Sequence, residues 1–84
     1  MQRIPILPSG NGVSEPRAVL SGTRELLIER HQGLFSYETK CIRVRLPNGI
    51  LTVKGSDLVI AYFGVEDLQI QGKIESIAMD GDGV

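Results

Sequence analysis

Apolar and polar residues alternate along several short stretches of this chain. The apolar members of three such stretches are Ile42, Val44 and Leu46, then Leu51 and Val53, then Leu68 and Ile70. Successive side chains of a β-strand point to opposite faces, so a period of two predicts strands with one buried and one solvated face. A helix would need apolar residues every three to four positions. The alternation therefore predicts an all-β protein.

Two further segments extend this prediction. Residues 58–63 are apolar at every position, which indicates a strand that is covered on both faces or presents one face to a partner. Residues 23–32 are the one place where a helix competes. Their apolar block, Leu26 to Ile28, is too short for a helical stripe and is bracketed by Gly22 and Gly33, so we expect a strand there as well.

The strands share a repeated plan. In each of four units an alternating stretch runs into a corner, and a second short strand follows, with corners at positions 22, 39, 55 and 72 and spacings of 17, 16 and 17 residues. About eight short strands in four pseudo-repeats of 16–17 residues could stack as a small β-solenoid. The second unit has Thr39 where the others have glycine. A period near 17 also arises from any two strands with two turns, so the two arrangements are equally favoured.

The connections support the alternative, an antiparallel meander folded as a two-layer sheet or a partly open barrel. Pro47, Asn48 and Gly49 separate two alternating stretches, and this turn chemistry is typical of an antiparallel hairpin. We expect the glycines at turns and corners to be structural; they are Gly22, Gly33, Gly49, Gly55 and Gly72.

The composition divides the chain into three parts. Residues 1–16 hold three of the four prolines and a Ser-Gly-Asn-Gly run, which predicts a flexible N-terminal arm. Residues 17–79 form the expected β-domain, and residues 80–84 a frayed tail.

Size and charge argue against an enzyme. A chain of 84 residues buries only about 60% of its unfolded surface, which leaves little room for a catalytic cavity. The net charge is −1, with the basic residues spread along the chain. The single cysteine, Cys41, cannot close an internal disulfide, which favours a reducing, cytoplasmic location. No apolar run approaches the roughly 18–20 residues that span a bilayer, so we expect membrane association only through a partner.

The residues that carry chemistry are scattered. His31 is the only histidine, and we interpret it as a turn histidine whose ring bonds a backbone carbonyl rather than as a metal ligand with Cys41. We expect no metal, no cofactor and no catalytic residues.

A small single-stranded nucleic-acid-binding β-domain is the alternative function. Its basic strip would be Lys40, Arg43 and Arg45, and its stacking residues Phe35, Tyr37, Tyr62 and Phe63. Three cations in a chain with ten acidic residues make a weak electrostatic footprint, so no nucleic-acid partner is expected.

The order and spacing of several elements resemble one known family. The matching stretches are Gly22-x-x-Glu25-Leu-x-Ile28-Glu29-x-His31-x-Gly33-Leu34, then Ile42-Arg43, then Gly49-x-Leu51-x-Val53-x-Gly55-x-x-Leu58-x-Ile60, then Glu66-x-Leu68-x-Ile70-x-Gly72-x-Ile74-x-x-Ile77. Together they resemble the YabP/YqfC family of bacterial sporulation proteins over residues 16–79, and the YqfC branch most closely through Ile-Glu-x-His-x-Gly-Leu and Gly-Lys-Ile-Glu. The N-terminus departs from the longer basic lead expected of the family.

The resemblance implies a non-enzymatic factor in endospore envelope or coat formation. It implies synthesis in the mother cell, a place in the cytoplasm or peripherally at the forespore, and a membrane-protein partner of the YqfD type. The family has no established catalytic residues. We therefore expect an assembly or partner-binding module, with homo-oligomerisation as a further possibility. The expected interface is a sheet edge or the outer face of residues 58–63, with Val59, Ala61 and Phe63 in contact and Arg43 and Arg45 steering.

Overall fold

The computed structural model describes residues 3–5 and 16–81, and every regular element in them is a β-strand. The strands are β1 (Arg3–Pro5), β2 (Arg17–Ser21), β3 (Glu25–Glu29), β4 (Leu34–Glu38), β5 (Cys41–Leu46), β6 (Gly49–Phe63) and β7 (Asp67–Gly81). They form one sheet in the order β1-β2-β3-β7-β6-β5-β4, and each neighbouring pair is antiparallel. The expectation of a small all-β domain is confirmed.

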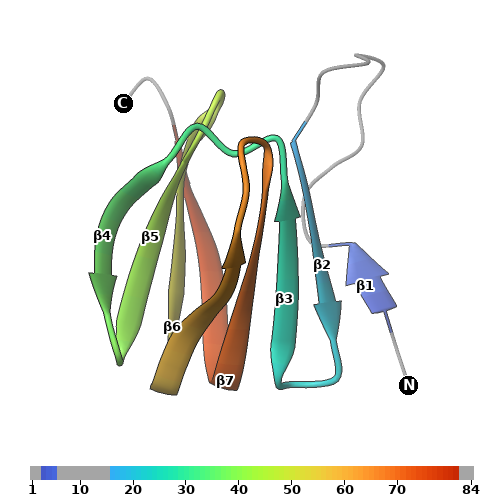
Figure 1. Cartoon of the computed structure of the whole chain (residues 1–84), viewed down its shortest axis with the longest axis vertical. Helices are drawn as coiled ribbons and strands as arrows, with labels where there is room; N and C mark the ends of the chain where they lie inside the picture. The colour runs from blue at the N-terminus through green and yellow to red at the C-terminus, as the bar shows by residue number, and fades with distance from the viewer. Residues whose placement is uncertain (1–2, 6–15, 82–84) are drawn as a thin grey trace.

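The sheet is folded into two layers because β6 and β7, of 15 residues each, bend in the middle. The first half of β6 pairs with β5, whereas the first half of β7 pairs with β3. We call β1, β2, β3, residues 67–71 and residues 59–63 the β3 layer. The β5 layer consists of β4, β5, residues 49–54 and residues 76–81. Figure 1 shows β6 and β7 passing from one layer to the other at the lower end of the view.

The core lies between the layers and draws on both. Its buried apolar side chains are Ala18, Leu26, Ile28, Ile42, Val44, Leu46, Leu51, Val53, Leu58, Leu68, Ile70 and Ile74. The paired residues share a face as the alternation predicts: buried Ile42 lies opposite buried Val53, and buried Leu26 opposite buried Ile70. Burying each such side chain stabilises the fold by about 1.5–3 kcal/mol, so the core requires both layers.

The four expected corners lie next to one another at the bends. The N–H groups of Gly55 and Leu58 donate to the carbonyls of Lys40 and Thr39, at 3.1 and 2.9 Å. Gly72 and Ile74 repeat this pattern toward Arg24 and Thr23, at 3.1 and 2.9 Å. Each hairpin turn therefore caps the bend of a long strand, in a similar way on both sides of the sheet.

Close approach of the two long strands explains why glycine stands at the bend of β6. A Cβ atom on Gly55 would lie 1.9 Å from the carbonyl oxygen of Lys73. No side chain fits there, and the lack of one lets β6 and β7 bend together at a point where their pairing register shifts.

Of the two arrangements left open by the sequence, the antiparallel one is present and the β-solenoid is not. The first unit closes as the β2–β3 hairpin and the second as the β4–β5 hairpin, so the two strands of each unit pair side by side, the first pair in the β3 layer and the second in the β5 layer. The third and fourth units run through their corners as continuous strands, so the four units supply six strands within residues 16–81 instead of about eight, and β1 in residues 3–5 adds a seventh. Residues 25–29 are a strand, and Pro47 and Asn48 form the hairpin turn between β5 and β6, both as predicted.

The proposed arm and tail fall mostly outside the described residues. Residues 1–2, 6–15 and 82–84 are not described, so the predicted domain limits stay predictions. Residues 3–5 form β1, which pairs with the end of β2. Gly22 lies in the β2–β3 turn, Gly33 in the β3–β4 connection and Gly49 at the start of β6, whereas Gly55 and Gly72 lie inside strands.

Candidate partner interface

The second half of β6 is an edge strand with exposed apolar side chains. Residues 59–63 pair with β7 on one side only, and no described strand pairs with the other side. The exposed fractions are 47% for Val59, 57% for Tyr62 and 55% for Phe63, and Ala61 is also exposed. We call these four residues the edge surface. An unpaired strand edge offers a row of backbone donors and acceptors to another chain.

A register shift decides which way these side chains point. Ile60 lies opposite the buried Ile70, but the pairing then shifts so that Tyr62 lies opposite Gln69 and Phe63 opposite the buried Leu68. The outer face of the edge surface therefore holds Val59 and Tyr62, while Phe63 lies on the side of the core. Simple alternation grouped Phe63 with Val59 and Ala61 and did not include Tyr62. An extra residue in one strand leaves no mark on the sequence pattern.

His31 fixes the end of the edge surface. Its Nδ1 accepts a hydrogen bond from the Gly33 N–H at 3.0 Å, so the ring proton sits on Nε2, which donates to the Gly64 carbonyl at 2.9 Å. The ring is stacked on Phe63, with centroids 5.2 Å apart and planes 23° apart. The prediction of a turn histidine bonded to a backbone carbonyl is confirmed. Both ring nitrogens are occupied within the protein.

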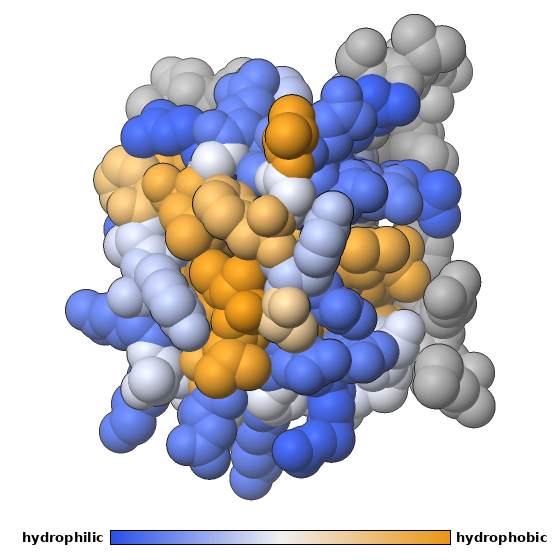
Figure 2. Space-filling model, in the orientation of Figure 1, coloured by the Kyte–Doolittle hydropathy of each residue, from blue (hydrophilic) through white to orange (hydrophobic). Residues whose placement is uncertain are grey.

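Apolar residues form a continuous area on this side of the molecule. Figure 2, in the orientation of Figure 1, shows orange side chains gathered over the region of β6 and toward β4, with blue polar residues above and below. Other exposed large apolar side chains are those of Phe35 and Tyr37 on β4 and of Val65 in the β6–β7 turn, which is almost fully exposed. Contiguous apolar surface rimmed by polar residues is typical of protein interaction sites.

The two predicted steering arginines belong to the other layer. Arg43 and Arg45 lie on β5 and face away from the core, alternating with buried Ile42, Val44 and Leu46. Their guanidinium carbons lie 5.8 and 5.1 Å from the centroid of the Phe35 ring, within the range of cation–π attraction. The structure therefore brings Val59, Ala61 and Phe63 together on one strand, and Arg43 and Arg45 together on another.

The described residues contain neither a metal cluster nor a membrane-spanning helix. No three His, Cys, Asp or Glu side chains in residues 3–5 and 16–81 gather in a way that could hold a metal ion. The same part of the chain forms no helix long and apolar enough to cross a bilayer. Cys41 is a partly buried free thiol.

The fold and its edge define the chain as a small antiparallel β-domain with an exposed apolar strand edge. The model of the YabP family matches residues 13–83, and the chain belongs to this sporulation-associated family. Neither the curated proteins nor the solved structures contain a match to this chain.

Proposed function

We propose that this domain is a non-enzymatic sporulation factor of the YqfC branch that binds a protein partner through its edge surface. The proposed partner is a sporulation membrane protein of the YqfD type, reached from the mother-cell cytoplasm during formation of the spore envelope or coat. The observation that carries the proposal is the free strand edge of residues 59–63 with its exposed apolar side chains.

The geometry of the edge suits addition of a strand from a partner. Unpaired backbone groups supply affinity in such contacts, and alternate side chains supply specificity. Val59 and Tyr62 would contact one face of the incoming segment. His31 holds Phe63 in a fixed position in the free protein, which lowers the entropy lost when a partner binds.

Co-purification tests this proposal directly. The tagged chain is co-expressed with the YqfD-type protein of the same genome and purified in detergent. Ala61→Asp and Val59→Asp place a charge in the proposed contact and should reduce the retained partner about tenfold or more, because an unpaired charge is costly to bury. Asn48→Asp is the matched control: it adds the same charge in the exposed β5–β6 turn and should retain the partner fully.

Two results would contradict the proposal. One is equal retention of the partner by all four proteins, and the other is no retention by the wild-type chain. Self-association through the same edge is the related outcome: large species in light scattering that disappear in Val59→Asp would show that a second copy occupies the edge.

A nucleic-acid-binding function is the second candidate, and one observation favours it. The guanidinium groups of Arg43 and Arg45 both lie near the exposed ring of Phe35, an arrangement that can stack a base beside its phosphate. Tyr62 and Phe63 lie in the other layer, away from this group. Salt-dependent retention on single-stranded DNA that is lost in Arg43→Ala would support it, whereas retention unaffected by salt or by this change would remove it.

A further inference from the structure

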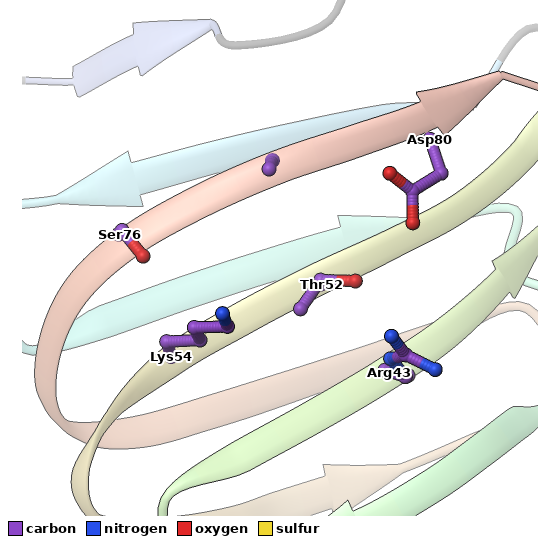
Figure 3. Close-up of a pocket in the computed structure, with 6 residues that line it drawn as sticks. Arg43, Thr52, Lys54, Ser76 and Asp80 are labelled. Atoms are coloured by element: carbon purple, nitrogen blue, oxygen red, sulfur yellow. The ribbon is translucent and has the colours of Figure 1, made fainter.

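The outer face of the β5 layer carries a polar hollow that contains none of the edge surface. Its volume is about 230 Å³, and it is lined by Arg43, Thr52, Lys54, Ser76, Ala78 and Asp80. Figure 3 shows these side chains on three adjacent strands, with Arg43 on β5, Thr52 and Lys54 on β6, and Ser76 and Asp80 on β7. Arg43, Thr52 and Ala78 lie in one row across the sheet, and Lys54 and Ser76 in the next.

One group in the hollow lacks a hydrogen-bond partner. Thr52 is only 8% exposed, and its Oγ1 is buried and forms no hydrogen bond with the described residues. Native proteins rarely leave a buried hydroxyl unpaired, because the lost hydration is not replaced. Figure 3 shows Thr52 on β6, with Arg43 on the neighbouring strand on one side and Asp80 on the neighbouring strand on the other. Its hydroxyl is the polar group of the lining that lacks a partner and that a ligand would pair.

The charged side chains that line the hollow favour a ligand with a single negative charge. Arg43 and Lys54 are positive and Asp80 is negative, which gives the lining a net charge of +1. Within residues 16–81 neither cation forms an ion pair with a carboxylate. A monoanion would neutralise the lining, whereas a phosphate dianion would leave it with a net charge of −1.

We propose that this hollow binds the carboxylate of an acidic side chain carried by a protein segment. Arg43 can hold a carboxylate through two parallel hydrogen bonds, Lys54 adds a point charge, and the Thr52 hydroxyl donates a further bond. Asp80 at the end of the hollow can accept a hydrogen bond from a backbone N–H of the same segment. The volume of about 230 Å³ lies below the roughly 300–1,000 Å³ typical of small-molecule pockets, which suits a single side chain.

The test is an NMR titration of the full chain, labelled with ¹⁵N, with two blocked peptides, acetyl-Gly-Glu-Gly-amide and acetyl-Gly-Gln-Gly-amide. Binding is monitored through the chemical shifts of the backbone amides. The Glu peptide should shift the Thr52 and Ala78 amides, and the Gln peptide should not. Arg43→Met should weaken binding of the Glu peptide about tenfold, the loss expected for a charge-assisted pair. Arg45→Met is the matched control on the same strand, outside the hollow, and should change binding less than about twofold.

Lys54→Met provides a second variant at an exposed position, where the change does not threaten folding, and should weaken binding about threefold or more. Inorganic phosphate is the third ligand. The proposal is overturned if both peptides shift the same amides equally, if phosphate binds more tightly than the Glu peptide, or if no shift occurs at about 50 mM peptide. It is also overturned if Arg43→Met and Arg45→Met weaken binding equally. Ala61→Asp should leave Glu-peptide binding intact, so failure here is separable from failure of the proposed edge interface.

Discussion

The imidazole of His31 lies against the ring of Phe63, with centroids 5.2 Å apart, and its Nε2 donates to the carbonyl of Gly64, which follows Phe63 in the chain. These contacts join the β3–β4 connection to the end of β6. A second bond joins the same regions nearby, since the His31 N–H donates to the Glu66 carbonyl at 3.0 Å. His31 thus links these two regions and positions the edge surface.

Replacement of His31 by alanine should destabilise the domain. His31 is only 7% exposed, and the change removes two hydrogen bonds of its ring and the stacking on Phe63, so we expect the free energy of unfolding to fall by about 2–3 kcal/mol. Urea denaturation measures it. Gln32→Ala, an exposed neighbour, is the control and should change stability by less than about 0.5 kcal/mol. Equal stability of the two variants would show that the contacts of the His31 side chain do not stabilise the domain.

Two glycine substitutions should differ strongly in effect. Gly55→Ala places a Cβ atom 1.9 Å from a backbone carbonyl in the opposite strand, and we expect a loss of about 3 kcal/mol or more. Gly22→Ala meets open space but keeps a φ of +61°, so its cost should be about 1 kcal/mol. Thermal unfolding followed by circular dichroism ranks them. The reverse order would mean that the bend of β6 is not as tight as the structure shows.

Substitutions of the adjacent residues Leu58 and Val59 should differ in their effect on stability, because one side chain is in the core and the other is on the surface. Leu58 is fully buried, and Leu58→Ala should lower the free energy of unfolding by about 2–5 kcal/mol through the lost burial and the resulting cavity. Val59→Ala removes exposed methyl groups and should stay within about 0.5 kcal/mol of wild type. Denaturant midpoints with unchanged slopes provide the measurement. A large loss in Val59→Ala would place Val59 in the core and remove it from the edge surface.

Removal of the unpaired hydroxyl should stabilise the free protein. Thr52→Val keeps the shape of the side chain and removes a buried polar group without a partner, so stability should rise by about 1 kcal/mol. Thr52→Ser keeps the hydroxyl and loses a methyl group, and should be destabilised by about 1 kcal/mol. Urea unfolding of the three proteins in a buffer without carboxylates or phosphate makes the comparison. Destabilisation of Thr52→Val by a similar amount would show that the hydroxyl is hydrogen-bonded in solution.

The core residues and the exposed edge strand could largely be predicted from the sequence. The direction in which the side chains of residues 59–63 point could not. The alternation placed Ile42, Val44 and Leu68 correctly in the core because burial follows the period of two directly. It did not predict that Tyr62 shares the outer face with Val59 while Phe63 turns toward the core, because the register shift after Ile60 depends on how β6 pairs with β7. The hollow was also out of reach: Arg43, Lys54 and Asp80 come from three strands, and only their pairing brings them together.

The sequence by itself determined an all-β chain with a histidine at a turn and an apolar stretch too long for one buried face, since period, turn chemistry and hydropathy are local properties. The tertiary structure decided between stacked rungs and folded hairpins. Thr39 and Lys40 lie beside Gly55 and Leu58, and Thr23 and Arg24 beside Gly72 and Ile74, through hydrogen bonds between residues 15 to 51 positions apart. Such contacts form only when the complete core can be buried between two layers, so no local pattern records them.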